Sequence, residues 1–371
     1  MEFIIEKKPF LNELRKIQEI TEKNPIIPIA SCVQIEAKKK SLIISATNFE
    51  VGLIIEQKAK VEREGKIVID ARKVYEIIKE MPEGDICLNK KDTGWIEISH
   101  NHKIVFNVPG LSEEEFPPIE TEEKIKFLNI NAKNVFELIK GTIYATSEDK
   151  TRDSLRGILV EKQKKGIRMV ATDGHRLALA DRVFLMDEEQ VIQKSVIIPK
   201  RGAREIKRLI EEKEKEESVK IGVGDKSLVI KGEEETIVIR LIEGEFPNYK
   251  KVIPTNNKNH VVIKTRELEG SLRRVALLAE EETKSVRFTI GSGIITISAK
   301  SIGLGDAREE RPTEYIGEEI EFGLNSKYIL DVLNTIEGEE VEMEILDGKT
   351  PVLIKEKGKE CTIAVIMPMI L

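Results

Sequence analysis

The sequence predicts an α+β fold of three similar domains, each built of antiparallel sheet and two helices. Three observations support this prediction. One set of amphipathic helices recurs along the chain, a second set recurs at nearly the same interval, and strand-like segments separate them. Repetition of one pattern at a long period is the signature of a repeated structural unit. We therefore expect domains at residues 1–125, 126–255 and 256–371.

Each domain is expected to begin with an amphipathic helix. Apolar side chains recur at helical spacing from Phe10, from Phe136 and from Leu268. These three positions are separated by 126 and 132 residues. The first helix of each domain therefore marks a long, nearly constant period.

A second helix is expected once in each interval, starting near Asp70, Pro199 and Asn325. Asp and Asn are favoured N-cap residues, and Pro suits the first helical position. These starts are separated by 129 and 126 residues. Two independent sets of markers thus agree on the period.

The segments between the helices predict strands, because short runs of β-branched and apolar residues are bounded by Gly, Asn and Asp. Asp173–Gly174 predicts a two-residue hairpin turn. The clearest predicted strands are Ser41–Ser45, Lys66–Asp70, Ile167–Ala171, Ser227–Ile230 and Ile294–Ser298.

Composition limits the class of protein. The chain has 371 residues, of which 40% are hydrophobic and 34% charged, which is typical of a soluble globular protein of several domains. No apolar run approaches the roughly 18 residues that a membrane span requires, and the N-terminus does not resemble a signal peptide. Cys32, Cys87 and Cys361 lie far apart in apolar segments, so we expect buried thiols in a reducing cytoplasm.

The formal net charge of −6 argues against a protein that holds nucleic acid through bulk positive charge.

Several motifs together resemble one family. The segments Ala171-Thr-Asp-Gly-His-Arg-Leu-Ala178 and Met367-Pro-Met-Ile-Leu371 resemble the signature loop and the closing segment of the bacterial DNA sliding clamps, the beta subunits of DNA polymerase III. The resemblance covers essentially the whole chain. Further matches are Asn24–Ile29, Ala71–Lys73, Phe246–Tyr249 and Tyr328–Asn334.

The resemblance implies a non-enzymatic processivity factor without a cofactor. Two chains would close head to tail as a homodimeric ring around duplex DNA, independently of base sequence, with the helices lining the bore. The ring would tether the replicative DNA polymerase. An ATP-dependent clamp loader would open it, and other polymerases and repair proteins would bind it through short peptide motifs.

The resemblance also implies a groove for these peptides. Ile370 stands where the family often has a basic residue, and Lys251 stands where it can have Arg; both changes bear on the preferred peptide motif. Carried onto matching positions, the groove comprises Leu155, Thr172, Gly174, His175, Arg176, Leu177, Pro247, Val252, Val365, Met367, Pro368, Met369 and Leu371.

Two further sets of residues are predicted. The predicted DNA-binding residues are Arg72, Lys73 and Arg152, which match family positions near DNA, and Lys200 and Arg201, which lie in the one plainly basic predicted helix. The predicted dimer interface places Phe106 of one chain against Leu277 and Leu278 of the other.

The motifs of other functions are incomplete in this sequence. A hydrolase using His175 and Asp173 lacks a Gly-x-Ser-x-Gly elbow. Residues 222–227 resemble a phosphate-binding loop but lack its Gly before Lys, and a predicted strand follows where that motif requires a helix. The four histidines show no ligand spacing that would predict a metal site. A three-domain scaffold that stays monomeric and never closes into a ring is the remaining alternative.

Overall fold

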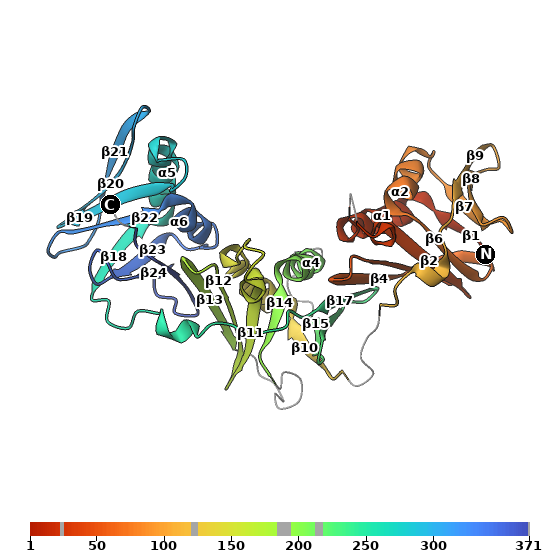
Figure 1. Ribbon diagram of the computed structural model, residues 1–371, viewed down its shortest axis with the longest axis horizontal. Coiled ribbons are helices and arrows are strands. Elements are labelled where there is room, and N and C mark those ends of the chain that lie inside the picture. Colours follow the sequence, from red (N-terminus) through yellow and green to blue (C-terminus); the bar gives the residue numbers. More distant parts are fainter. Residues whose placement is uncertain (23–25, 120–124, 184–193, 212–217, 370–371) are drawn as a thin grey trace. The chain divides into compact units, whose positions relative to one another are not determined.

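The computed structural model describes residues 1–22, 26–119, 125–183, 194–211 and 218–369 (Figure 1). Its backbone contacts divide the chain into two compact units. Unit 1 contains Met1–Ala132 and Arg204–Leu241, and unit 2 contains Lys133–Ala203 and Ile242–Leu371.

Unit 1 contains two antiparallel sheets. The first has the order β5 (Lys60–Arg63), β1 (Glu2–Glu6), β7 (Asp85–Lys90), β8 (Trp95–His100), β9 (Ile104–Pro109). The second has eight strands in the order β10 (Phe127–Asn131), β15 (Ser218–Val223), β16 (Ser227–Lys231), β17 (Glu235–Arg240), β4 (Val51–Lys58), β3 (Ser41–Thr47), β2 (Cys32–Lys38), β6 (Gly65–Asp70).

Unit 2 also contains two antiparallel sheets. The larger has the order β14 (Val196–Pro199), β11 (Gly157–Gln163), β12 (Gly166–Thr172), β13 (Arg176–Val183), β25 (Thr362–Ile366), β24 (Val352–Glu356), β23 (Glu340–Ile345), β18 (Asn259–Lys264). The smaller has the order β21 (Gly305–Pro312), β20 (Ile294–Ser301), β19 (Ser285–Gly291), β22 (Ile320–Asn325).

The described residues form six α-helices, which confirms the predicted α+β class. Within unit 1, α1 packs against α2, and within unit 2, α5 packs against α6 (Figure 1). The helices are α1 (Lys7–Ile20), α2 (Ala71–Glu80), α3 (Ala132–Lys140), α4 (Lys200–Glu211), α5 (Thr265–Val275) and α6 (Ser326–Leu333).

Two of the predicted helix starts are capped as expected. The Asp70 carboxylate accepts a hydrogen bond from the Lys73 backbone N at 2.8 Å, and the Asn325 side chain accepts one from the Lys327 N at 2.9 Å. These caps satisfy backbone donors that the first turn of a helix leaves unpaired. Pro199 was placed in a helix by the sequence, but it ends strand β14 and α4 begins one residue later.

Two local predictions were wrong. Asp173–His175 separate β12 from β13, so this hairpin has a wider loop than the predicted two-residue turn, because Asp173 caps the following backbone amides. Cys32 is buried, but Cys87 is half-buried and Cys361 is exposed, because a turn precedes β25 at that point.

Apolar side chains fill the space between helices and sheets. Phe3 and Phe10 meet edge to face in unit 1, and Phe288 stacks on Phe322 in unit 2. All four rings are fully buried, and such burial is the main stabilising contribution to the fold.

The order of elements repeats three times along the chain. Each repeat runs strand, first helix, a set of strands, second helix and three further strands, beginning with β1, β10 and β18. The last strand of the second repeat, β17, pairs with β4 of the first, and the last strand of the third, β25, pairs with β13 of the second. Neighbouring repeats are thus joined by the same kind of antiparallel strand pair.

Candidate functional site

The loop between β12 and β13 is held rigid by its own side chains. Asp173 Oδ1 accepts hydrogen bonds from the backbone N of His175 at 2.9 Å and of Arg176 at 3.0 Å. The Thr172 hydroxyl donates to the Arg176 carbonyl at 2.6 Å and accepts from the Gly174 N at 3.1 Å. Gly174 has φ of 93°, which is unfavourable for residues that carry a Cβ. The loop therefore presents a fixed surface.

Arg176 fastens this loop to α6. Its side chain is 8% exposed, and it forms ion pairs with Asp173 at 3.0 Å and with Asp331 at 2.6 Å. The guanidinium also donates to the Tyr144 carbonyl at 2.6 Å and lies 4.3 Å from the centroid of the Tyr328 ring. A buried charge is tolerated only when its donors are satisfied, and here carboxylates, a carbonyl and ring faces satisfy them.

The segment after β25 completes the site. The Met367 backbone N donates to the His175 carbonyl at 3.0 Å, and this bond continues the β13–β25 pairing beyond its last described pair, Arg176 with Ile366. Farther along, the Met369 N donates to the Gly323 carbonyl at 2.8 Å. The chain therefore leaves the loop after Met367 and turns toward β22.

These segments enclose a cavity of about 270 Å³ within unit 2. Its apolar walls come from the loop, from the segment after Phe246 and from the end of β25. The Met367 side chain is of a type that adapts to varied apolar partners. It is lined by Arg152, Leu155, Thr172, Gly174, His175, Arg176, Leu177, Pro247, Asn248, Tyr249, Val252, Val365 and Met367.

Most of the predicted groove residues therefore line one cavity. Pro368 and Met369 do not, because the backbone of Met369 is engaged with Gly323 instead. Leu371 and Ile370 lie outside the described residues. Arg152, which was predicted to contact DNA, lines the groove and forms an ion pair with Asp149 at 3.6 Å.

The sequence did not single out Tyr249 as a wall of the groove, although it belongs to a quoted motif. Its hydroxyl donates to Glu161 at 2.5 Å and accepts from Arg168, while Arg168 pairs with Asp181 at 2.6 Å. Burial raises the pKa of Tyr249 to about 12, so the ring stays neutral and its hydroxyl remains a donor.

The other predicted DNA-binding residues lie on two helices. Arg72 and Lys73, in the first turn of α2, both pair with Glu76, at 2.9 and 3.4 Å. Lys200 begins α4 and pairs with Glu148, and Arg201 follows it with a half-buried side chain. Exposed pairs of this kind are weak, so a phosphate can compete for the same cations.

The predicted dimer residues are partly exposed apolar side chains. Phe106 is 41% exposed on β9, an edge strand. Leu277 is 76% exposed in the short helix η7 (Ala276–Leu278), which packs against β20 and β21, and Leu278 is half-buried. Both sets lie beside an open sheet edge.

Three family models for the DNA polymerase III beta subunit match the chain: the N-terminal domain at residues 1–120, the central domain at 129–248 and the C-terminal domain at 250–370. The chain is 30% identical to the beta sliding clamp of Caulobacter vibrioides and 29% identical to that of Pseudomonas putida, over the full length of each. The chain belongs to the beta sliding clamp family. This family consists of processivity factors and not of catalysts.

Solved clamp structures share the fold. The DNA polymerase III subunit beta of Pseudomonas aeruginosa superposes with a TM-score of 0.93 at 28% identity, and the Thermotoga maritima beta subunit with 0.90 at 26%. Both comparisons cover this whole chain, with 100% and 99% of the other. None of the six described helices could span a membrane.

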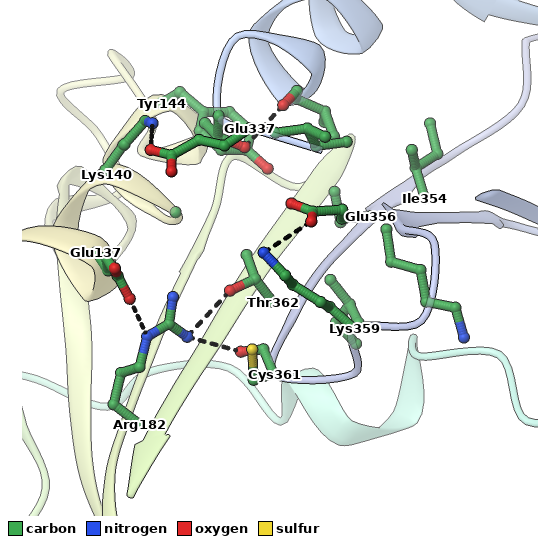
Figure 2. A pocket seen from close by; sticks show the side chains of 17 residues that line it. Glu137, Lys140, Tyr144, Arg182, Glu337, Ile354, Glu356, Lys359, Cys361 and Thr362 are labelled. Atoms are coloured by element: carbon green, nitrogen blue, oxygen red, sulfur yellow. Dashed lines mark hydrogen bonds and ion pairs between the residues drawn. The ribbon is translucent and has the colours of Figure 1, made fainter. Parts of the chain in front are cut away.

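A second cavity of the clamp chain, about 250 Å³, lies between α3, α6 and the β24–β25 hairpin (Figure 2). Its charged side chains pair with one another: Arg182 with Glu137 at 2.8 Å, Lys140 with Glu337 at 2.8 Å and Lys359 with Glu356 at 2.7 Å (Figure 2). The hydrogen bond from Lys140 lowers the pKa of Glu337, so the pair stays charged near neutral pH. Of these pairs, Lys140–Glu337 joins the second repeat to the third.

One group of side chains has ligand types typical of a metal site. His260 lies 2.8 Å from Glu342, with Glu344 nearby. The Lys355 ammonium, however, lies 2.6 Å from Glu344 and 3.7 Å from Glu342, so a side-chain cation already pairs with both carboxylates.

Proposed function

We propose that two copies of this chain close head to tail into a ring around duplex DNA and hold a DNA polymerase on it through the groove of unit 2. Encirclement makes each rebinding of the polymerase an intramolecular event, so that effective concentration replaces bulk concentration. Retention by topology needs few phosphate contacts, which is compatible with the net charge of −6.

One observation carries this proposal. Two of the three expected junctions between repeats are formed within the chain, and each of the two strands expected to form the third junction has an open edge. β17 and β25 close the first two junctions against β4 and β13. Their counterparts in the remaining repeats, β9 and β21, are both edge strands (Figure 1). Open edges are liabilities that pairing removes.

The two formed junctions share one register. Leu53 of β4 faces Ile237 of β17, and Ala178 of β13 faces Ala364 of β25. The strand pairings within each repeat show that Leu53 and Ala178 occupy equivalent positions in the first and second repeats. Ile237 and Ala364 likewise occupy equivalent positions in the second and third repeats. The junction therefore has a repeated geometry that can be extended to the third case.

Extending the alignment places Phe106 of one chain opposite Ala307 of the next. Within the first repeat, Phe106 pairs with Ile98 in the position that Ile237 and Ile230 occupy in the second repeat. Within the third repeat, Ala307 pairs with Ala299 in the position that Ala178 and Ala171 occupy in the second. A large ring against a small side chain makes a compact cross-strand pair. Two such junctions, related by a two-fold axis, close six repeats into a ring.

The exposed Leu277 belongs to the same surface, because η7 packs beside β21. With Phe106 it supplies the apolar core of the proposed interface, and Leu278 supports it.

The groove suits short extended peptides with apolar anchors, which usually dominate affinity in small interfaces. The replicative polymerase, other polymerases and repair proteins would then compete for it. A separate ATP-dependent loader would open the ring, since residues 222–227 span the end of β15, a turn and the start of β16 and do not form a phosphate-binding loop. The proposed place of action is the bacterial cytoplasm, where the chromosome lies.

Cysteine cross-linking tests the interface and its register. Val105 and Arg308 face each other in the proposed pairing, so a chain with Val105→Cys and Arg308→Cys should form covalent dimers under mild oxidation, because facing strand residues fall within disulfide range. The control chain with Val105→Cys and Asp306→Cys is out of register and should cross-link poorly. Equal cross-linking of both chains, or none in either, would reject the proposed junction.

A further inference from the structure

Unit 1 contains a cavity of about 320 Å³ where the β3–β4 loop meets the end of β17. Its walls come from three segments: residues 47–52, residues 117–119 and residues 226–240. The two repeats can be aligned by their strand pairings and by their Phe-Pro segments. Nine of the eleven described residues that line the cavity then match residues that line the groove of unit 2.

The loops of the two cavities match in detail. Thr47 faces Gly52 across the β3–β4 hairpin as Thr172 faces Leu177 across β12–β13. In each loop the threonine hydroxyl accepts a hydrogen bond from the backbone N two residues later, at 3.1 Å in both cases.

The closing strands match as well. The Arg240 backbone N donates to the Glu50 carbonyl at 2.9 Å, as the Met367 N donates to the His175 carbonyl at 3.0 Å. A Phe-Pro segment supplies the third wall of each cavity, with Pro117 in unit 1. The cavity of unit 1 is therefore built on the same backbone as the groove.

The side chains differ, and these differences set the ligand. Arg240 stands in place of Met367 and Glu50 in place of His175. Arg240 is exposed, and its guanidinium forms no salt bridge among the residues the structure describes. A cation at the wall of an apolar pocket is a partner for a ligand carboxylate.

Phe49 stands in place of Gly174 and keeps the left-handed backbone, with φ of 68°. This conformation is rare and strained for a bulky residue. The ring is nevertheless 44% exposed at the cavity, and the strain holds an aromatic face toward solvent. Conformations of this kind cluster at ligand-binding sites.

The floor differs in shape. Gly52 replaces Leu177, and a Cβ at Gly52 would lie 2.7 Å from the Ile119 side chain. Ile119 therefore approaches the strand closely and serves as an apolar floor for the cavity, with Pro117 and Val238 beside it.

From these features we propose that the cavity of unit 1 is a second peptide site, which binds a short extended peptide with one carboxylate next to an apolar side chain. Arg240 binds the carboxylate, and Phe49 and Ile119 pack on the apolar residue. Glu50, which has no salt bridge among the described residues, disfavours a second acidic group. The inference rests on the proposed function for the class of ligand, because the groove of unit 2 is itself proposed to bind peptides.

Methyl NMR of the full-length protein, labelled at Ile and Met methyl groups, tests the two sites separately. The probe is the peptide Gly-Ser-Leu-Glu-Leu-Phe, with a twin that carries Lys in place of Glu. The Ile119 δ1-methyl reports on the second site and the Met367 ε-methyl on the groove. We expect the Glu peptide to shift the Ile119 signal in a saturable titration.

Arg240→Glu should raise the dissociation constant measured at Ile119 at least about tenfold for the Glu peptide, because a charge-assisted contact is lost and repulsion replaces it. The Lys twin should bind the variant better than the native protein. Arg266→Glu, a change at another exposed arginine, should leave both titrations as in the native protein.

Each outcome has a distinct meaning. If the Met367 signal shifts on titration and the Ile119 signal does not, the second site is overturned and the groove stands. An Ile119 shift that Arg240→Glu does not weaken overturns the assigned ligand chemistry. If the Ile119 signal shifts and the Met367 signal does not, the second site is supported and the groove is contradicted.

Discussion

Arg176, the first residue of β13, forms an ion pair with Asp331 of α6, and their Nη1 and Oδ2 atoms are 2.6 Å apart. The two residues belong to different repeats, and Arg176 also lines the groove. The shape of the groove thus depends on a contact between the second and third repeats.

Removing this contact should loosen the loop and weaken the fold. Asp331→Ala leaves a buried guanidinium short of one partner, and we expect a loss of about 1–3 kcal/mol in unfolding free energy in urea. Peptide affinity should fall several-fold, since the loop carries one groove wall. Glu269→Ala, which breaks an exposed helical pair with Arg273, should cost only about 0.3–0.5 kcal/mol. Equal losses of unfolding free energy in the two variants would show that the Arg176–Asp331 pair contributes no more than an exposed ion pair.

Deleting the tail tests the groove. A chain without residues 367–371 should lose binding of a polymerase-derived peptide by at least about 2 kcal/mol in a fluorescence titration. Its mass by light scattering should stay dimeric, because the tail is not part of the proposed β9–β21 interface. Peptide binding by the truncated chain would reject the groove, and dissociation of the dimer would show that the tail is structural.

Point changes in the tail sharpen this test. Met367→Ala should weaken the peptide, because Met367 lines the cavity, whereas Pro368→Ala should have little effect, because Pro368 does not. The same titration distinguishes them. The opposite order of effects would contradict the described course of the tail.

The interface prediction concerns the exposed leucines of η7. The double change Leu277→Ala with Leu278→Asp removes apolar surface and adds a charge, so light scattering at micromolar concentration should give folded monomers. Val183→Asp, at another exposed apolar residue, should remain dimeric. A dimeric double variant would place the interface elsewhere.

The DNA prediction concerns the basic residues of α2 and α4. Changing Arg72, Lys200 and Arg201 to Glu should weaken binding of a short duplex and flatten its salt dependence by about one unit of slope for each lost phosphate contact. Fluorescence anisotropy at several salt concentrations measures both. A matched triple change of strand residues Lys60, Lys66 and Arg287 to Glu should keep the slope. An unchanged slope in the first variant would show that its three residues do not contact DNA.

The sequence predicts what local chemistry and periodicity determine. The caps at Asp70 and Asn325 were predictable, because an N-cap depends on residues within one turn. The two helix periods were predictable as well, since amphipathic spacing is visible in the sequence. Cys361 was not, because its exposure depends on a turn that its apolar neighbours conceal.

Contacts between distant segments could not be read from residue patterns alone. Nothing near Arg176 identifies Asp331 as its partner, because the two lie 155 residues apart. The cavity of unit 1 was missed for another reason. Its Glu50 and Arg240 differ in type from the groove residues at matching positions, and only the strand register relates the two sites.

Retention on circular DNA tests the proposed ring most directly. Clamps placed on a nicked plasmid by a loader are separated from free protein by gel filtration in about 0.5 M salt, which suppresses binding by phosphate contacts. We expect the protein to stay with the circle and to leave when a restriction enzyme linearises it. Protein cross-linked through the Val105–Arg308 cysteine pair should stay on linear DNA whose ends are blocked. Loss from the intact circle at high salt, or retention on linear DNA with free ends, would contradict a closed ring.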